Sequence, residues 1–169
     1  MISTLKRNDV AAAVGDIGSA ITTAKTEAVS RGIDVTICGS NDGATCAGSS
    51  DWSNGWIVFS DDADGTVETG IGEEIYHAHG LTNDSSIKVT DADDNGVNFL
   101  TFTPRGRVSQ GIQATFKVCG RDNDVSFARA VLLERVGRAI HAFDLHLADG
   151  SAGSDNIYED VNGDNLACP

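Results

Sequence analysis

The first thirty residues follow the period of an α-helix in their apolar and polar positions. Apolar side chains recur every three or four residues, at Val10, Val14, Ile17, Ile21, Ala24 and Ala28. Polar residues such as Asp16, Ser19 and Glu27 fall on the opposite face, so this pattern predicts an amphipathic helix over about residues 3–31. Gly32 is expected to end the helix as a left-handed cap.

This predicted helix contains two glycines that lower its intrinsic stability. Gly15 and Gly18 each cost about 1 kcal/mol relative to alanine inside a helix. At 1.5 Å per residue the helix spans roughly 40 Å, which is more than a small globule needs to cover one sheet. Packing on a partner surface is therefore expected to hold the segment helical.

After Gly32 the apolar period changes from about four to two, which is typical of β-strands. Segments rich in β-branched and aromatic residues predict strands at 33–38, 55–60, 73–79, 86–90, 98–103, 114–119 and 128–135. The connectors between them are rich in glycine, asparagine and aspartate, which favour tight turns. One leading helix followed by antiparallel strands predicts an α+β fold, with residues 1–31 as the helix and 32–169 as a β-rich head within one domain.

Composition limits the partners that such a chain attracts. Its 169 residues carry a net charge of −13, which disfavours general attraction to DNA, RNA or anionic membranes. No run of about 20 apolar residues is present, so no segment of the sequence is expected to span a bilayer.

Cysteine usage points to an oxidising compartment. The four cysteines, Cys38, Cys46, Cys119 and Cys168, contain no C-x-x-C pair and lack a histidine at zinc-finger spacing. Their even number predicts two disulfides, for which three pairings are possible. Cys38 with Cys46 is favoured by the turn-rich segment between them, and Cys119 with Cys168 would tether the polar C-terminal tail. The sequence shows no signal peptide, which conflicts with such a compartment and predicts that an N-terminal segment is missing.

Candidate chemical sites are few. His77 and His79 alternate on one predicted strand, but no acidic or cysteine partner lies at a telling spacing, so they are interpreted as surface residues. Asp160, Asn162 and Asp164 alternate around Gly163 like the opening of a calcium loop, but the acidic residue that closes an EF-hand is missing. A solvated turn is the simpler interpretation, with calcium as a weak alternative. The acidic groups Asp61, Asp62, Asp64 and Asp91, Asp93, Asp94 are likewise interpreted as hairpin turns.

We expect no other cofactor and no enzymatic activity. The sequence contains no G-x-S-x-G nucleophile elbow, and a reduced catalytic thiol does not suit paired cysteines. Trp52 and Trp56, on either side of a short SNG turn, are expected to pack in the core, with a subunit contact as the alternative.

Several of these motifs together resemble the FimT/FimU/GspH family of type IV minor pilins and type II secretion pseudopilins. The matching segments are AKTEAVSRGIDVTIC (24–38) with Gly43 and Cys46, DWSNGWIVFSD (51–61), FTPRG (102–106), TFKVC (115–119) and LLERVGR (132–138). Their order holds over roughly residues 20–138.

The resemblance implies a type IV pilin-like fold and a non-catalytic structural role. In this family an apolar N-terminal segment follows a short leader, anchors the subunit in the inner membrane and later packs inside a helical fibre. Residues 1–31 would then be the soluble half of that helix. The face formed by Val10, Val14, Ile17 and Ile21 would be shared between the chain's own sheet and neighbouring subunits.

Other minor pilins or pseudopilins and the major pilin are the partners that this resemblance implies. The tail tethered by Cys168 favours a subunit that primes or caps a type IV pilus, with a type II secretion pseudopilin as the alternative. Some FimT-type members resemble DNA receptors with a basic G-R-x-R motif. Here Ile140 stands in place of the second arginine after Gly137 and Arg138, so DNA uptake is disfavoured.

Overall fold

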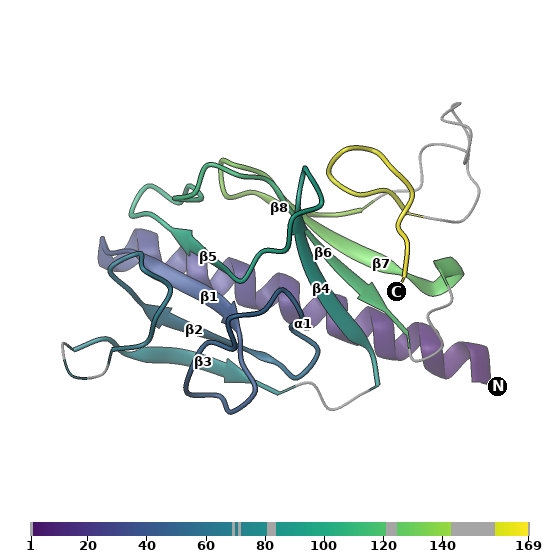
Figure 1. Cartoon of the computed structure of the whole chain (residues 1–169), viewed down its shortest axis with the longest axis horizontal. Helices are drawn as coiled ribbons and strands as arrows, with labels where there is room; N and C mark the ends of the chain where they lie inside the picture. Colours follow the sequence, from purple (N-terminus) through teal and green to yellow (C-terminus); the bar gives the residue numbers. More distant parts are fainter. Residues whose placement is uncertain are drawn as a thin grey trace.

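The computed structural model describes residues 2–68, 70, 72–80, 84–120, 125–142 and 158–168. The segment 143–157 therefore lies outside the described residues. Two layers make up the rest: one long helix, and two antiparallel sheets that lie side by side along it (Figure 1).

The N-terminal segment forms a single helix, α1, over Ile2–Arg31, which confirms the helix predicted from the apolar period. Its 30 residues give a length of about 45 Å at 1.5 Å per residue. The backbone turns into the left-handed region at Gly32, where φ is 69° and the amide donates to the carbonyl of Ala28 at 3.0 Å. Glycine adopts this conformation without the penalty that a Cβ brings, and the predicted cap is therefore confirmed. Among the described residues, no helix combines the length and apolar character that a bilayer crossing requires.

The first sheet follows directly from the helix cap. Its strands are β1 (Val35–Gly39), β2 (Trp56–Ser60), β3 (Ile75–His79) and β5 (Phe99–Phe102), in the spatial order β3-β2-β1-β5. Every pair in it is antiparallel.

The second sheet contains the remaining strands. These are β4 (Ser86–Asp91), β6 (Ala114–Cys119), β7 (Arg129–Leu133) and β8 (Ala139–His141), in the order β4-β6-β7-β8, again with antiparallel pairing. A short 3₁₀ helix, η2 (Val125–Phe127), precedes β7.

All seven predicted strands are present, and β8 is the strand that the sequence pattern missed. It has only three residues, and the turn before it closes through hydrogen bonds from Glu134 N to Arg138 O and from Gly137 N to Glu134 O, at 2.9 and 2.8 Å. Too few alternating positions remain in a strand of this length for a period to be visible. The predicted strand 128–135 ends at Leu133 because this turn begins at Glu134.

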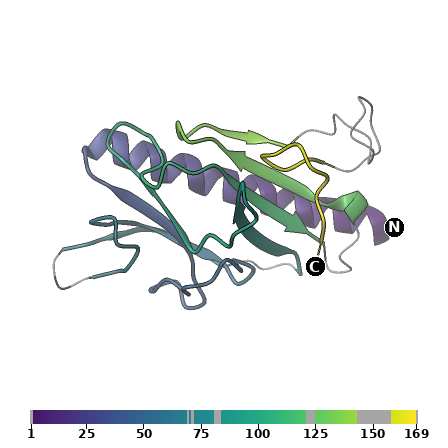
Figure 2. The same ribbon diagram turned by 45° about the horizontal axis from the view of Figure 1, so that its top comes forward.

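The main core consists of side chains from α1 and from both sheets. The rotated view shows the two sheets lying along the helix (Figure 2). Val10, Val14, Ile17 and Ile21 are each at most 5% exposed and belong to this core. Complete burial of one such side chain contributes roughly 1.5–3 kcal/mol. The sequence-based assignment of these four residues to a face shared with neighbouring subunits is therefore corrected, because the chain's own sheets already cover them.

Candidate assembly surface

The outward side of α1 carries a row of small, uncharged side chains. Exposed residues recur at four- and three-residue steps, and we call this row the outward stripe: Ala11, Gly15, Ser19, Thr22 and Thr26. Residues at this spacing lie on one side of a helix. Because their side chains are short, a neighbouring helix could approach the α1 backbone closely.

The two glycines in the middle of the helix are not required by the fold of this chain. A Cβ built on Gly15 would meet no atom within 4 Å, and one on Gly18 would meet only the Val131 side chain, at 4.0 Å. Neither residue has a positive φ. Each weakens the helix relative to alanine, by about 1 kcal/mol, without a compensating contact in the described part of the chain.

A groove runs along one side of the outward stripe, between α1 and the last two strands of the second sheet. Its volume is about 610 Å³, and it is lined by Val14, Gly15, Gly18, Ser19, Thr22, Thr23, Val131, Ala139, Ile140 and His141. The strand beside it, β8, is the last in the order β4-β6-β7-β8 and is therefore an edge strand. Edge strands present backbone groups that a further chain can bind.

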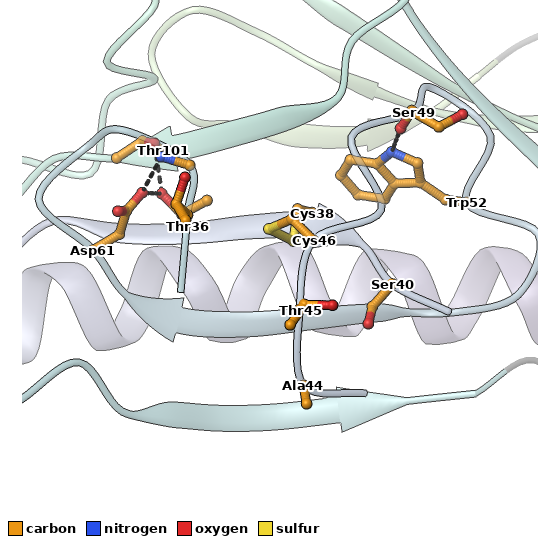
Figure 3. The surroundings of a disulfide bond; sticks show 12 residues. Thr36, Cys38, Ser40, Ala44, Thr45, Cys46, Ser49, Trp52, Asp61 and Thr101 are labelled. Atoms are coloured by element: carbon orange, nitrogen blue, oxygen red, sulfur yellow. Dashed lines mark hydrogen bonds between the residues drawn. A yellow bond between two sulfur atoms is a disulfide. The ribbon is translucent and has the colours of Figure 1, made fainter. Parts of the chain in front are cut away.

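Both disulfides form in the pairing that the sequence favoured. The first, Cys38–Cys46, joins the end of β1 to the loop that follows it, with the Cα atoms 5.6 Å apart (Figure 3). The second, Cys119–Cys168, joins the end of β6 to the tail across 49 positions of sequence.

The loop closed by the first disulfide is organised around one carboxylate. Oδ1 of Asp42 accepts hydrogen bonds from the amides of Ala44 and Thr45, both at 2.8 Å, and Oδ2 accepts one from the Thr45 hydroxyl. These donors, led by the Ala44 amide, hold the pKa of Asp42 far below its ordinary value. The Asp42 carboxylate is therefore ionised at neutral pH, where it accepts these hydrogen bonds from the loop.

Both tryptophans pack inside the molecule, which confirms the core interpretation. Trp52 is fully buried, its indole N–H donates to the Ser49 carbonyl at 3.1 Å, and its ring meets Phe116 edge-on at 5.4 Å. Trp56 is also fully buried and stacks on His79 with ring centroids 4.6 Å apart. Neither ring is accessible to a neighbouring subunit.

The histidine pair lies at the contact between β3 and the helix. The His77 and His79 rings are stacked at 6.2 Å, and His79 Nε2 lies 3.5 Å from an Asp16 carboxylate oxygen on α1. Neither histidine belongs to the groups of metal-ligating side chains found among the described residues.

The candidate calcium turn in the tail is held by hydrogen bonds of its own. Oδ1 of Asp160 accepts from the amides of Asn162 and Asp164, at 2.7 and 3.1 Å. The Asn162 side-chain amide donates to the carbonyl of Ala92, far away in the sequence. These hydrogen bonds account for the shape of the turn, and calcium at this turn stays a prediction.

The arginines of the β7–β8 turn and of the β5–β6 loop fall into two groups. The guanidinium of Arg138 donates to both oxygens of Glu134, at 2.7 and 2.8 Å, and this contact lowers the pKa of Glu134. Exposed Arg105, Arg107 and Arg135 instead line a pocket of about 550 Å³ that contains no acidic residue.

Comparisons with known proteins place this architecture in a family. A family model for the type II transport protein GspH matches residues 13–137, which is well over half of the chain. The chain belongs to the GspH family. The resemblance noted in the sequence is thereby confirmed, and this GspH-family chain is a minor pilin or pseudopilin, a class of structural subunits of type IV pili and type II secretion systems.

Solved structures of a similar protein agree with the fold of this GspH-family chain. The type IV minor pilin FimU of Pseudomonas aeruginosa strain PAO1, in space group P21, matches with a TM-score of 0.62 and 21% identity, over 80% of this chain and 89% of that one. A second crystal form, P65, gives a TM-score of 0.59 and 21% identity over 77% and 90%. A search of curated proteins gives no match. The pilin-like α+β fold expected from the sequence is therefore confirmed.

Proposed function

We propose that this chain is a minor pilin that primes or caps a type IV pilus and packs on neighbouring subunits through the outward stripe of α1. The observation that carries the proposal is the pair of glycines at positions 15 and 18, for which the folded chain itself gives no steric reason. Small residues allow helix backbones to approach closely, as they do where helices associate inside membranes. The residues that meet the neighbours are then Gly15, Ser19 and Thr22, rather than the buried apolar face.

Site-specific cross-linking in cells that express the protein from its own gene tests this assignment. All four natural cysteines are in disulfides, so Ser19→Cys or Thr22→Cys introduces a single free thiol on the outward stripe. We expect oxidation to join this thiol to a cysteine placed on the helix of a neighbouring pilin. Asp93→Cys is the matched control, because Asp93 is exposed on the turn after β4 and lies outside the stripe. Equal cross-linking from the control, or none from the stripe, would refute the packing mode.

The proposal also includes a membrane-anchored stage. We infer that an apolar segment continues α1 upstream and holds the subunit in the inner membrane, with the head in the periplasm, before assembly. The support for this is family membership and the two disulfides, which suit an oxidising compartment. The encoded sequence upstream of Ile2 tests the inference directly: we expect a leader ending in glycine, then an apolar run that starts with phenylalanine and has glutamate fifth.

A pseudopilin of a type II secretion system is the second candidate, favoured by the description of the matching family model. The tethered tail and the likeness to a type IV minor pilin favour the pilus instead. Deletion of the gene separates the two candidates. Loss of surface pili with normal secretion supports the first, and loss of secretion with normal pili supports the second.

DNA binding is a further alternative, and one observation favours it. Arg105, Arg107 and Arg135 line one pocket in a chain whose net charge is −13. Against it, Arg138 of the late hairpin already forms an ion pair with Glu134. A salt titration distinguishes the cases, since a site with several phosphate contacts loses affinity steeply as salt increases. We expect no measurable binding to DNA even at low salt.

A further inference from the structure

The connection between β2 and β3 concentrates negative charge. Residues 61–74 contain six carboxylates and no lysine or arginine: Asp61, Asp62, Asp64, Glu68, Glu73 and Glu74. Within the described residues, no ion pair relieves the repulsion among the first five. Such a loop is expected to spread its side chains apart, unless something else holds them together.

The structure instead brings these carboxylates close to one another. One oxygen from each of Asp61, Asp62 and Glu73 lies within 4.8 Å of the other two. A second group, Asp62, Asp64 and Glu68, meets the same criterion and shares Asp62 with the first.

Asp61 differs from the rest of the cluster because it is buried. Asp61 is 7% exposed, and its Oδ2 accepts a hydrogen bond from the Thr36 hydroxyl at 2.5 Å (Figure 3). Oδ2 also accepts a hydrogen bond from the Gly65 amide at 3.0 Å. Oδ1 is also buried, and within the described part of the chain it has no hydrogen-bond partner. A buried carboxylate oxygen without a partner is unfavourable, and most such atoms in proteins bind a donor, a water or an ion.

The opposite side of the cluster is held by the loop backbone. Oε1 of Glu73 accepts from the amide of Asp62 at 3.2 Å, and Oε2 accepts from the amide of Glu68 at 2.6 Å. Glu73 is thus fixed across the loop from Asp61, while the exposed carboxylate of Asp62 completes the group.

We propose that the β2–β3 loop binds one Ca²⁺ through Asp61, Asp62 and Glu73. Carboxylate oxygens are hard ligands, and Ca²⁺ accepts six to eight of them at 2.3–2.6 Å in irregular geometry. Two oxygens on opposite sides of such an ion lie roughly 4.6–5.2 Å apart, which is compatible with the spacing of this group. Zn²⁺ is disfavoured because the cluster offers neither histidine nor cysteine. Asp64 and Glu68 add negative charge beside the ion.

Calorimetric titration of the 169-residue chain with CaCl₂, at ionic strength balanced with KCl, tests the site. We expect one Ca²⁺ per chain, an increase in the melting temperature with Ca²⁺, and at least tenfold weaker binding of Mg²⁺. Asp62→Asn removes one ligand charge while leaving every hydrogen bond to Asp61 and Glu73 in place, and should weaken Ca²⁺ binding at least tenfold. Asp93→Asn, the same change on the turn after β4, is the matched control and should alter affinity less than twofold.

Three results would overturn the assignment. The first is no saturable binding to the unmodified chain up to about 10 mM CaCl₂, beyond the range of weak extracellular calcium modules. The second is equal weakening by Asp62→Asn and Asp93→Asn, which would mean general charge screening. The third is equal affinity for Mg²⁺ and Ca²⁺. Glu73→Gln should also weaken Ca²⁺ binding in the same titration. This second variant distinguishes loss of a ligand from a folding defect that is specific to Asp62→Asn.

Discussion

Replacing the helix glycines with alanine should stabilise the isolated chain and weaken its assembly. Gly15→Ala adds a Cβ that meets no atom within 4 Å, and Gly18→Ala adds one that only touches Val131. Alanine favours a helix over glycine by about 0.8–1 kcal/mol per position, so the double variant gains roughly 2 kcal/mol in free energy of unfolding. For a domain of this size, each kcal/mol corresponds to roughly 2–4 °C in melting temperature.

Thermal and urea denaturation of the chain measure the first half of this expectation. A gain in the urea midpoint with an unchanged slope would show that stability, and not the compactness of either state, has changed. A loss of stability in the double variant would refute the argument, because it would mean that the glycines serve the fold of the chain itself.

The second half of the expectation concerns assembly in cells. If the outward stripe is a packing surface, one methyl group at each glycine holds the neighbouring backbone away, and pilus number should decrease although the subunit is more stable. Asp93→Ala is a suitable control, since Asp93 is exposed on the turn after β4 and lies outside the outward stripe. Unchanged piliation in the double variant would refute the close-packing role of Gly15 and Gly18.

Three further expectations concern the head of the protein. Gly137→Ala should lower the free energy of unfolding by about 1–3 kcal/mol in chemical denaturation, because φ is 76° and a Cβ would lie 1.9 Å from a backbone oxygen of the facing turn. Gly111→Ala is the control, because Gly111 also has a positive φ but a Cβ there would meet open space. Equal destabilisation by both variants would show that the steric clash is not the cause. Replacing Cys119 and Cys168 with alanine should lower the free energy of unfolding by about 4 kcal/mol, and replacing Cys38 and Cys46 should lower it by about 2.5 kcal/mol. The difference arises because the second disulfide closes a loop of 49 positions and the first a loop of 8, and a longer loop loses more entropy on closure. A larger decrease in the urea midpoint on removal of the first disulfide would contradict this expectation. Because the pKa of Asp42 is lowered from its ordinary value of 3.8, its carboxylate stabilises the folded chain above pH 3.8, and this stabilisation is lost as the pH falls below 3.8. The difference in free energy of unfolding between the unmodified chain and Asp42→Asn should therefore be constant above about pH 5 and become smaller in more acidic buffer. A constant difference down to about pH 2 would be evidence against this expectation.

The sequence predicts elements well where a long periodic run exists. The helix, its Gly32 cap and seven strands follow from local patterns, because burial on one side imposes a period of about four or of two. The three-residue strand β8 lies below the length at which such a period is visible. The family motifs added the pilin-like architecture, which periodicity alone does not specify.

Candidate surfaces were harder to predict, because they depend on which face the chain itself covers. Val10 and Ile17 look like a packing face in the sequence, and only the structure shows that both sheets bury them. Gly15 and Gly18 were noted for their cost, but the space beside them is a property of the folded chain. In the sequence Asp61 looks like one of several turn aspartates. Only the folded chain brings it against Thr36, which lies 25 positions earlier on β1.

In the described part of the chain α1 precedes every strand, and this order has a consequence for biosynthesis. The helix leaves the ribosome before any strand, and it carries the apolar side that both sheets need in order to be covered. Each strand that emerges later therefore finds the apolar residues that it packs against already translated, which shortens the time for which its own apolar face is exposed to wrong partners. A chaperone would have less to protect in this subunit than in one whose covering helix is translated last.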